Sequence, residues 1–586
     1  MLLVVSHFGK MTYSFLSRIK VLSFFIVFFA VILVGKLFIV QVVRSASYAD
    51  RADRQYFTPS SDIFERGNIF FTRRDGVQVS GATQASGFKI AISPREIIDP
   101  EKAYESLATI LDFDHDSFLL KASKSNDPYE EIANRMTKET ADKVIALKVP
   151  GVHIYKQKWR FYPGGSMAAH TLGFVGFQGN ELSGRYGLER QYNNILAKGG
   201  DTPYVNFFAE VFSNIRANLS SEDEARSGDI VTTIEPEVQD FLSQKLSEVA
   251  TKYNTDSIGG IIMNPQDGSI YALDAKPSFN PNEYSLVKNI NVFTNPLAEN
   301  VFEFGSIVKP LVMASALDKG VLTANTTYED KGYVIVDGNK QINNFDKKGR
   351  GPGTTMQEVL NQSLNTGMVF VFHKLGKQSM YDYMLSYGIN EKTGIDLPNE
   401  TSGLISGLTS NLKNTREIEY ANAAFGQGIA LTPLEITRAL ASLGNGGNLV
   451  VPHIVKEIKY NDGLKKDLSY PTTRVKISEK TSEEITRMLV TVMDKSLKGG
   501  LAKLPHYSVA VKTGTAQVAK PGGGGYYDDR HTHSFFGYFP AYDPRFIVFL
   551  YAINPKGVPY ASQTWADPFL DITKFLLNYY EVQPDR

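Results

Sequence analysis

A serine and a lysine three residues apart are the side chains in this sequence that most directly suggest covalent chemistry. Ser306 and Lys309 lie in Phe304-Gly-Ser-Ile-Val-Lys-Pro310. On a helix, residues at this spacing share one face, with Cβ atoms about 5–6 Å apart. A serine hydroxyl becomes a nucleophile only when a base takes its proton, and a lysine in a desolvated cleft can be neutral and act as that base. We therefore predict a nucleophile at Ser306 and a general base at Lys309.

Four other serine–lysine pairs have the same spacing, so the spacing alone is weakly specific. They are Ser17 with Lys20, Ser86 with Lys89, Ser285 with Lys288, and Ser410 with Lys413. Only Ser306 follows a glycine and lies just before an apolar segment, residues 311–317, that we expect to be helical. Backbone N–H groups at the start of a helix stabilise negative charge, which favours Ser306 as the reacting serine.

Two further short patterns follow later in the chain. Ser363-Leu-Asn365 comes at the end of an expected helix, and Lys512-Thr-Gly-Thr515 continues a strand-like alternation of apolar and polar residues. A second Lys-Thr-Gly lies at residues 392–394. We interpret this second copy as a turn, because the residues on both sides of it are typical of a loop.

The order Ser-x-x-Lys, Ser-x-Asn, Lys-Thr-Gly is the pattern of penicillin-recognising serine enzymes. With its flanking segments, the chain resembles a class B penicillin-binding protein, a membrane-anchored peptidoglycan transpeptidase, over nearly its whole length. The flanking segments that carry the resemblance are Glu65-Arg-Gly-Asn-Ile69, Arg74-Asp-Gly76, Arg160-Phe-Tyr-Pro163, Gly184-Arg-Tyr-Gly-Leu-Glu189, Thr393-Gly-Ile-Asp-Leu-Pro398 with Glu400, Phe425-Gly-Gln-Gly428 and Leu431-Thr-Pro433.

The resemblance implies a role for each residue of the first two motifs. Ser306 resembles the acylated nucleophile, and Lys309 resembles its general base. Ser363 resembles the residue that relays a proton to the leaving amine. Asn365 resembles the residue whose side-chain amide binds the substrate backbone.

The third motif is expected to bind the end of the substrate. By resemblance, Lys512 and Thr513 contact the terminal carboxylate, and the backbone N–H groups of Ser306 and Thr515 form the oxyanion hole. Gly514 suits a strand edge that the substrate backbone approaches closely.

Two positions depart from the family pattern. Phe304 stands where a proline usually precedes the Gly-Ser pair, and Leu364 stands where a small polar residue is commoner inside Ser-x-Asn. Neither change removes a reacting group, so both are candidates for altering the fit of substrate or antibiotic.

The implied reaction is acyl transfer. A stem peptide ending in D-Ala-D-Ala acylates Ser306 and releases D-alanine, an amine from a neighbouring stem then forms the cross-link, and β-lactams are trapped as stable acyl-enzymes. A D,D-carboxypeptidase and a catalytically silent β-lactam sensor or scaffold are the alternatives. A β-lactamase-type hydrolase is disfavoured, because no credible glutamate follows Ser363 to activate water.

The resemblance also implies partners. Residues 44–230 show no recognisable glycosyltransferase motif, which implies a separate glycan polymerase of the SEDS family and proteins of the division or elongation machinery. The segments Phe302–Gly305 and Ser363–Gly367 lean slightly toward the division type, and the choice between the two roles stays open.

Composition excludes several other chemistries. The 586 residues include 62 Lys+Arg and 62 Asp+Glu, and this neutral balance argues against nucleic-acid binding. The absence of cysteine removes disulfides, iron–sulfur clusters and Cys-ligated zinc. His531 and His533 have no third ligand nearby in sequence, so we interpret them as surface residues and predict neither metal nor cofactor. We interpret Gly522–Gly525 as a mobile loop and Tyr526 and Tyr527 as candidates for lining the substrate groove.

Residues 21–43 form the only long apolar stretch. As a helix they span about 34 Å, enough for a hydrocarbon core of ~30 Å. Lys10, Arg18 and Lys20 precede the stretch without any acidic residue, which favours a cytoplasmic N-terminus. We therefore predict a single-pass anchor in the cytoplasmic (inner) membrane, with the catalytic part periplasmic or extracellular. The alternative is a signal peptide cut after Ser47, and Met11 is an alternative start.

We expect an α+β fold in four parts. These are a cytoplasmic tail (1–20), a transmembrane helix (21–43), an extended mixed α/β pedestal (44–230), and a transpeptidase domain (231–586) with an antiparallel sheet, flanking helices and a helical subdomain. Helices are expected at 100–111, 138–147, from Pro236, from the capping box at Thr432–Glu435, and around Phe569–Leu576. Strands are expected at 89–92, 230–234, 259–263, 269–273, 534–539 and 546–553.

Overall fold

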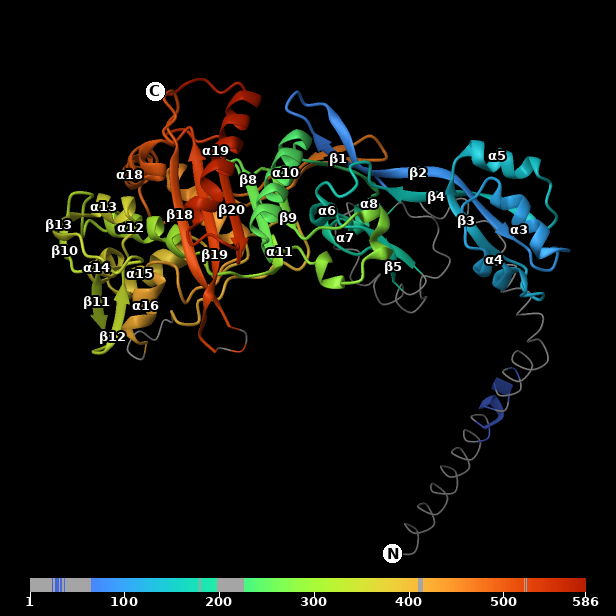
Figure 1. The fold of residues 1–586 in the computed structure, drawn as a ribbon, viewed down its shortest axis with the longest axis horizontal. Coiled ribbons are helices and arrows are strands. Elements are labelled where there is room, and N and C mark those ends of the chain that lie inside the picture. Colours follow the sequence, from blue (N-terminus) through green and yellow to red (C-terminus); the bar gives the residue numbers. More distant parts are fainter. Residues whose placement is uncertain are drawn as a thin grey trace, which may run out of the picture. The chain divides into compact units, whose positions relative to one another are not determined.

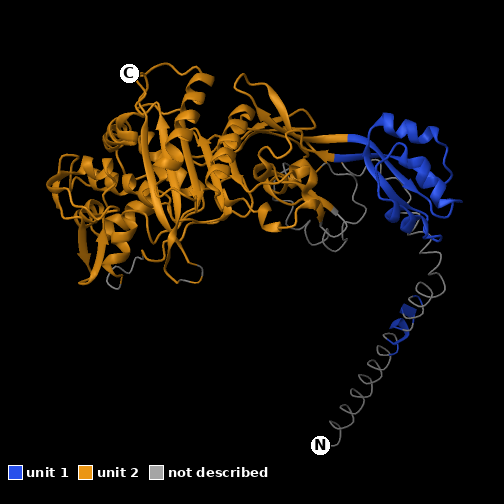
Figure 2. Ribbon diagram, viewed as in Figure 1, with its two compact units in different colours: residues 1–63, 86–159 blue, residues 64–85, 160–586 orange. Residues whose placement is uncertain are grey.

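A computed structural model describes residues 65–178, 181–197, 226–408, 415–520, 522 and 524–586, together with positions 24, 27–30, 32–33 and 36. Among these residues no helix is both long and apolar enough to cross a membrane. The expected tail and anchor, residues 1–43, fall mostly outside the described residues and stay predictions. The chain forms two compact units, residues 1–63 with 86–159 and residues 64–85 with 160–586 (Figure 2).

The smaller unit is a small α+β body. Its helices and strands are the second part of β2 (Gln78–Ile92), α3 (Pro100–Ala108), α4 (His115–Ala122), β3 (Glu130–Met136), α5 (Lys138–Ala146) and β4 (Val152–Phe161). Both β3 and β4 pair with β2, and Leu107, Phe118 and Val144 form its buried core. The two expected helices are confirmed, whereas the strand expected at 89–92 is the end of the much longer β2.

In the larger unit, one sheet joins segments far apart in sequence. The first part of β2 pairs with β1 (Ile69–Thr72), which runs parallel to β7 (Gly228–Thr232). Strand β15 (Val455–Tyr460) then pairs antiparallel with β7 and with β16 (Lys465–Asp467). Beside them the chain forms the hairpin β5 (Val175–Gln178) and β6 (Glu181–Gly184) and three short helices, α6 (Ala169–Leu172), α7 (Gly187–Gln191) and α8 (Asn193–Leu196).

The same region is held together by a buried ion cluster. Glu189 is fully buried, and its two carboxylate oxygens each accept a bond of 2.5 Å, from Arg66 Nε and from Arg160 Nε. Tyr162 donates to the same carboxylate. Arg66 comes from the chain just before β1, Arg160 from the end of β4 and Glu189 from α7, so the cluster fixes three segments together.

The catalytic-domain sheet is antiparallel, as expected, and has five strands. Their order is β18 (Ala510–Ala519), β19 (Tyr526–Phe539), β20 (Phe546–Ile553), β8 (Ser257–Met263) and β9 (Ile270–Lys276). Helices α10 (Pro236–Tyr253) and α19 (Ala561–Tyr579) cover one face, and α11 (Pro296–Glu299), α17 (Pro433–Gly444) and α18 (Glu479–Lys495) cover the other (Figure 1). A Cβ at Gly537 would lie 2.4 Å from the Phe569 ring, so this glycine lets α19 pack closely on β19.

The remaining elements form the expected helical subdomain beside the edge strand β18 (Figure 1). They are α12 (Lys309–Asp318), β10 (Thr327–Asp330), β11 (Tyr333–Val336), β12 (Lys340–Asn343), β13 (Gly351–Thr355), α13 (Met356–Asn361), α14 (Asn365–Leu375), α15 (Lys377–Ser386) and α16 (Glu417–Ala423). Shorter elements are the 3₁₀ turns η3 (Pro281–Leu286), η4 (Ile290–Phe293), η5 (Gly305–Val308) and η6 (Leu497–Gly500), and the strands β14 (Asn448–Leu449) and β17 (Thr473–Arg474).

Local sequence signals predicted several boundaries correctly. The capping box is confirmed at α17, where Thr432 accepts from the Glu435 backbone N–H and Glu435 accepts from the Thr432 N–H. The turn between β8 and β9 closes with Asn264 N–H donating to the Ser269 carbonyl. The cap residues therefore fix where α17 begins, and the turn residues fix where β8 ends and β9 begins.

We predict that replacing Glu189 with alanine lowers the free energy of unfolding by about 3–5 kcal/mol, because it leaves two buried guanidinium groups without their carboxylate. Urea denaturation followed by circular dichroism measures this loss. Glu237→Ala is the matched control, since its pair with Arg73 spans 4.0 Å between half-exposed side chains and is worth little. Equal stability of the two variants would contradict the prediction.

Candidate active site

The predicted nucleophile lies in a short turn that only glycine allows to form. Ser306 is the second residue of η5, and Lys309 is the first residue of α12. Gly305 has φ +63°, and a Cβ there would lie 2.7 Å from the carbonyl oxygen of Thr515. Glycine at 305 therefore brings the serine turn against strand β18.

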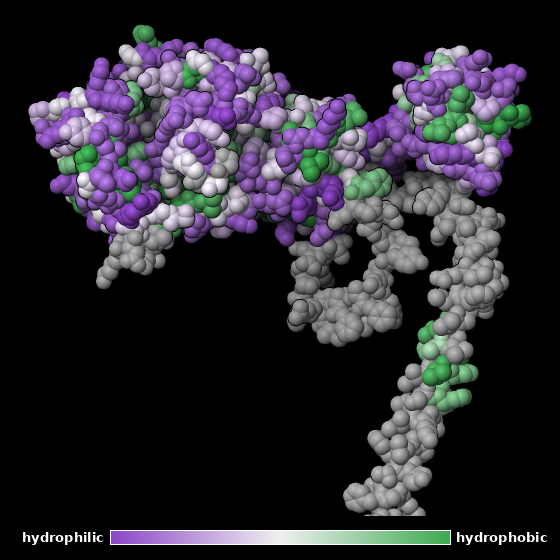
Figure 3. Space-filling view, turned by 60° about the horizontal axis from the view of Figure 1, so that its bottom comes forward, coloured by the Kyte–Doolittle hydropathy of each residue, from purple (hydrophilic) through white to green (hydrophobic). Residues whose placement is uncertain are grey.

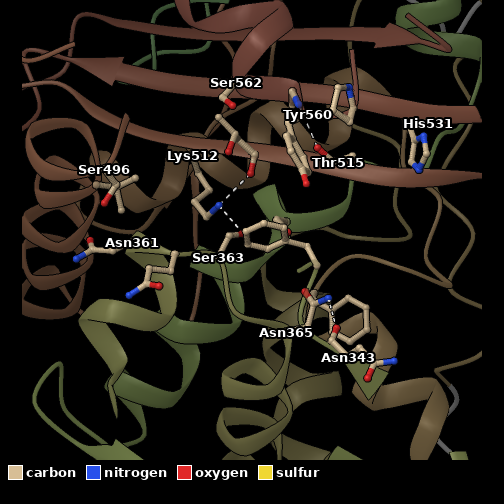
Figure 4. Close-up of a pocket in the computed structure, with 18 of the residues that line it drawn as sticks. Asn343, Asn361, Ser363, Asn365, Ser496, Lys512, Thr515, His531, Tyr560 and Ser562 are labelled. Carbon is tan, nitrogen blue, oxygen red and sulfur yellow. Dashed lines mark hydrogen bonds between the residues drawn. The ribbon is translucent and has the colours of Figure 1, made fainter. Parts of the chain in front are cut away.

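A cleft of about 900 Å³ opens at this junction. Six of the eight predicted site residues line it, from η5, from the start of α14 and from β18: Ser306, Ser363, Asn365, Lys512, Thr513 and Thr515. Figure 4 shows Lys512 and Thr515 on the strand side, facing Ser363 and Asn365 on the helical side. The three motifs, distant in sequence, thus meet at one cavity.

Lys309 is fully buried behind the cleft, and its Nζ points at the second motif. Its Nζ donates to the Ser363 carbonyl oxygen (2.7 Å), the Asn365 Oδ1 (2.8 Å) and, more weakly, the Ser363 Oγ (3.3 Å). Burial, and then the charge of Lys512, hold the pKa of Lys309 well below its ordinary value. A neutral amine keeps enough N–H donors for the two shorter contacts and has a lone pair left to accept a proton.

Lys512 approaches the same serine from the opposite wall. Its Nζ donates to Ser363 Oγ at 2.9 Å and to the Thr513 carbonyl at 3.0 Å. Burial lowers the pKa of Lys512 to about 7. In the described part of the chain, no carboxylate pairs with either lysine, so the Ser363 hydroxyl lies between two amines that resist being charged together.

The Ser306 hydroxyl differs from the Ser363 hydroxyl in its lack of protein partners. Ser306 is half-buried, and among the described residues nothing forms a hydrogen bond with its side chain. Its oxygen is therefore free to face a molecule in the cleft.

Ser363 adopts a strained backbone conformation at the end of α13. Its φ is +55°, a left-handed conformation that favours glycine. The following backbone N–H, from Leu364, donates to the Val359 carbonyl at 3.0 Å, and the Ser363 N–H donates to Leu360 at 3.4 Å. This is the Schellman pattern that ends many helices, with serine in the place usually taken by glycine.

The two departures from the family pattern lie in the core and not in the cleft. Leu364 is fully buried, in the position where a Schellman turn normally makes an apolar contact with Val359. Phe304 is 1% exposed and packs edge-on against Phe549. Neither residue lines the cleft, so packing explains both.

Strand alternation separates the residues of the third motif. Thr513 and Thr515 are half-exposed and line the cleft. Lys512, Gly514 and Ala516 are buried, and of these three Lys512 alone also lines the cleft. A Cβ at Gly514 would lie 2.3 Å from both the Phe304 carbonyl oxygen and the Ser534 Oγ. Gly514 therefore makes room for the protein's own turn, and this differs from the expected close approach of substrate.

A polar network that the sequence did not indicate supports the second motif. Asp330, 1% exposed, accepts from the side chains of Asn344 and Thr366 at 2.8–3.1 Å. The Asn365 Nδ2 donates to the Asn343 carbonyl at 2.9 Å. These contacts join the β12–β13 loop to the start of α14 and fix the direction of the Asn365 side chain. An Asn-Asn pair in a loop is not a sequence signal that predicts such a network.

Several other interpretations are also decided. His533 is fully buried and pairs with Thr564 at 2.8 Å, so its assignment to the surface was wrong; it packs inside because β19 is covered by α19. His531 lines the cleft.

Tyr526 and Tyr527, expected to line the substrate groove, do not line the cleft; the Tyr526 hydroxyl instead donates to the Glu303 carboxylate. The second Lys-Thr-Gly lies in a loop, as expected. The expected glycine loop falls partly outside the described residues.

The sequence matches two protein-family descriptions. Residues 258–573 match "Penicillin binding protein transpeptidase domain", and residues 64–230 match "Penicillin-binding Protein dimerisation domain". Stage V sporulation protein D of Bacillus subtilis (strain 168) is 31% identical over 514 residues, covering 86% of this chain and 77% of that protein. The chain belongs to the class B penicillin-binding proteins.

Other relatives and solved structures similar to this penicillin-binding protein belong to the same family. Peptidoglycan D,D-transpeptidase FtsI of Escherichia coli (strain K12) is 27% identical over 461 residues, with 78% of this chain and 73% of that protein covered. Penicillin binding protein 3 of Mycobacterium tuberculosis, complexed with aztreonam, aligns with TM-score 0.66 at 22% identity over 89% of this chain and 97% of that one. Penicillin Binding Protein 2X of Streptococcus thermophilus aligns with TM-score 0.69 at 19% identity over 89% and 80%. At these identities the two structures show a shared fold.

We predict that Ser363→Gly is more stable than Ser363→Ala by about 1 kcal/mol. Both variants lose the hydroxyl, but only alanine keeps the cost of a left-handed backbone. Urea denaturation of the two purified proteins measures the difference, and both should react slowly with penicillin. Equal stability would show that the turn carries no strain.

Proposed function

We propose that this class B penicillin-binding protein is a serine D,D-transpeptidase that cross-links peptidoglycan stem peptides through an acyl-enzyme on Ser306. The transpeptidase family match and the D,D-transpeptidases among the relatives support the activity. The observation that carries the residue assignments is the meeting of two buried lysines at the Ser363 hydroxyl, in the cleft that Ser306 also lines.

Acylation begins with proton removal. Neutral Lys309 takes the Ser306 proton as the oxygen attacks the carbonyl carbon of the penultimate D-alanine, forming a new C–O bond. The carbonyl oxygen becomes an oxyanion held by the backbone N–H groups of Ser306 and Thr515. The carbonyl re-forms as the C–N bond breaks, and the leaving amine takes a proton that passes from Lys309 through the Ser363 hydroxyl.

The cross-link forms by the reverse sequence. A neutral amine of a neighbouring stem peptide attacks the ester carbonyl, its proton passes to Lys309, and the Ser306 oxygen leaves and regains a proton. In a β-lactam the C–N bond that breaks is part of a ring, so the leaving amine stays attached and occupies the space that the acceptor needs. The same cleft therefore accounts for turnover of peptide and trapping of drug.

Substrate binding depends on the edge strand β18. An edge strand presents unpaired backbone groups, and a peptide laid along it places its terminal carboxylate near Lys512 and Thr513. The Asn365 side chain, whose oxygen accepts from Lys309, keeps one N–H of its amide for the peptide backbone beyond the bond to Asn343. Both contacts orient the scissile bond toward Ser306.

We place the protein in the cytoplasmic membrane through residues 21–43, with residues 1–20 cytoplasmic, a pedestal at 44–230 and the catalytic domain at 231–586 outside the cytoplasm. The residues of this segment that the structure describes are mostly hydrophobic (Figure 3), and an apolar composition suits a helix in lipid. A SEDS-family polymerase and the division or elongation machinery are the proposed protein partners.

We predict that a fluorescent penicillin labels the chain at Ser306. Ser306→Ala should lose labelling because the acyl acceptor is gone, whereas Ser285→Ala, which changes a serine with the same lysine spacing, should keep it. Intact-protein mass spectrometry with peptide mapping locates the adduct. An adduct that persists in Ser306→Ala would refute the assignment.

We predict that the acylation rate rises with pH along a limb set by Lys309, because only the neutral amine accepts the Ser306 proton. Burial, and then the charge of Lys512, lower the pKa of Lys309. Lys512→Ala removes that charge, so the pKa of Lys309 should rise and the limb should move to higher pH. Residual acylation is measured by mass spectrometry across a series of pH values.

Lys498→Ala is the matched control for this pH measurement. Lys498 also lines the cleft, but it pairs with Asp567 at 2.5 Å, and its loss should leave the position of the limb unchanged. A limb that stays in place in Lys512→Ala, or that moves to lower pH, would contradict the coupling.

A further inference from the structure

Two half-exposed aromatic rings meet across the cleft. Phe345, 55% exposed, and Tyr560, 45% exposed, both line the cavity. Their ring centroids lie 5.7 Å apart at 78°, an edge-to-face contact. Among the described residues neither ring contacts another aromatic ring, so each ring's aromatic neighbour belongs to the opposite side of the cleft.

The Phe345 side is fixed to the second motif. Phe345 lies in the loop between β12 and β13, directly after Asn343 and Asn344. The Asn343 carbonyl accepts from Asn365 Nδ2 at 2.9 Å, and Asn344 Oδ1 accepts from the Thr366 N–H at 3.2 Å. The base of this ring therefore cannot move without disturbing the start of α14.

The Tyr560 side is fixed to the third motif. Tyr560 comes just before α19, and the next residue, Ala561, donates its N–H to Thr515 Oγ1 at 3.2 Å. Figure 4 shows Tyr560 beside Thr515, across the cleft from Asn343 and Asn365. Both ring bases are anchored to motif residues, so the ring contact joins the two walls of the cleft.

We propose that Phe345 and Tyr560 are specificity-determining residues that form an aromatic clasp and limit the size of the acyl group entering the site. This inference rests on the proposed function. Both rings line the cleft that Ser306 lines, so a small acyl donor fits beside the joined rings, whereas a donor with a bulky group on its acylated side must part them. Losing one aromatic pair corresponds to a change of about 2- to 12-fold.

The test uses the full chain and penams that differ only in the 6-amino substituent. These are 6-aminopenicillanic acid, which has no acyl group, benzylpenicillin, and piperacillin, whose acyl group is large. Second-order acylation rate constants come from intact-protein mass spectrometry. We expect the ratio of the piperacillin rate to the 6-aminopenicillanic acid rate to rise about 2- to 12-fold in Phe345→Ala and in Tyr560→Ala.

Three further comparisons separate a clasp from two independent contacts. The double variant should match the single variants, because either change alone opens the clasp. Phe345→Tyr and Tyr560→Phe keep both rings and should keep the wild-type ratio. Tyr333→Ala, which removes a 49% exposed ring of β11 that does not line the cleft, is the surface control and should also keep it.

The outcomes that overturn the clasp differ from those that overturn the proposed function. A ratio that is unchanged or lower in either alanine variant, or effects that add in the double variant, would reject the clasp while the Ser306 adduct still formed. Absence of a Ser306 adduct with every penam would instead reject the transpeptidase assignment.

Discussion

The site depends on the burial of two lysines around one serine hydroxyl without a carboxylate beside them. Desolvation disfavours the charged form of each amine, and the charge of one disfavours the charge of the other. Each amine therefore loses its proton more readily than a free lysine does, and both lie within reach of the same oxygen. A carboxylate placed there would favour the charged form of both lysines.

The surrounding structure keeps the lysines in this unfavourable arrangement. The Ser363 turn holds its carbonyl and its hydroxyl toward Lys309 at the cost of a left-handed backbone. The turn is stabilised by helix-ending hydrogen bonds and by the burial of Leu364, and the buried Asp330 network holds the next residues. The backbone strain at Ser363 is offset by well-packed neighbours, as expected of functional sites.

Close packing around the site also explains Gly305, Gly514 and the unusual residue Phe304. Gly305 and Gly514 bring the serine turn and β18 together at distances that no side chain would allow. Phe304, two residues before Ser306, packs in the core against Phe549 and not in the cleft. Substitutions near Ser306 are therefore limited by packing on the core side and by the substrate on the cleft side.

Features that depend on residues close together in the sequence could be predicted, and features that depend on distant residues could not. The α17 capping box, the start of α10 at Pro236 and the strands β8 and β9 depend on short-range signals, and each appeared close to where it was expected. The pairing of β15 with β7 was not predicted, because partners far apart in sequence leave no mark on local pattern. His533 was misassigned for the same reason, since its burial depends on α19.

By itself the sequence determined which side chains are available for reaction: a serine with a lysine one helical turn away, a Ser-x-Asn, a Lys-Thr-Gly, and no cysteine. Residue type and local spacing are properties of the chain, so they needed no structure. Only the tertiary structure decided that Lys512 and Lys309 share Ser363, that Gly514 faces the protein and not the cleft, and that Phe345 meets Tyr560. These facts depend on distances between segments and on exclusion of water, which folding alone creates.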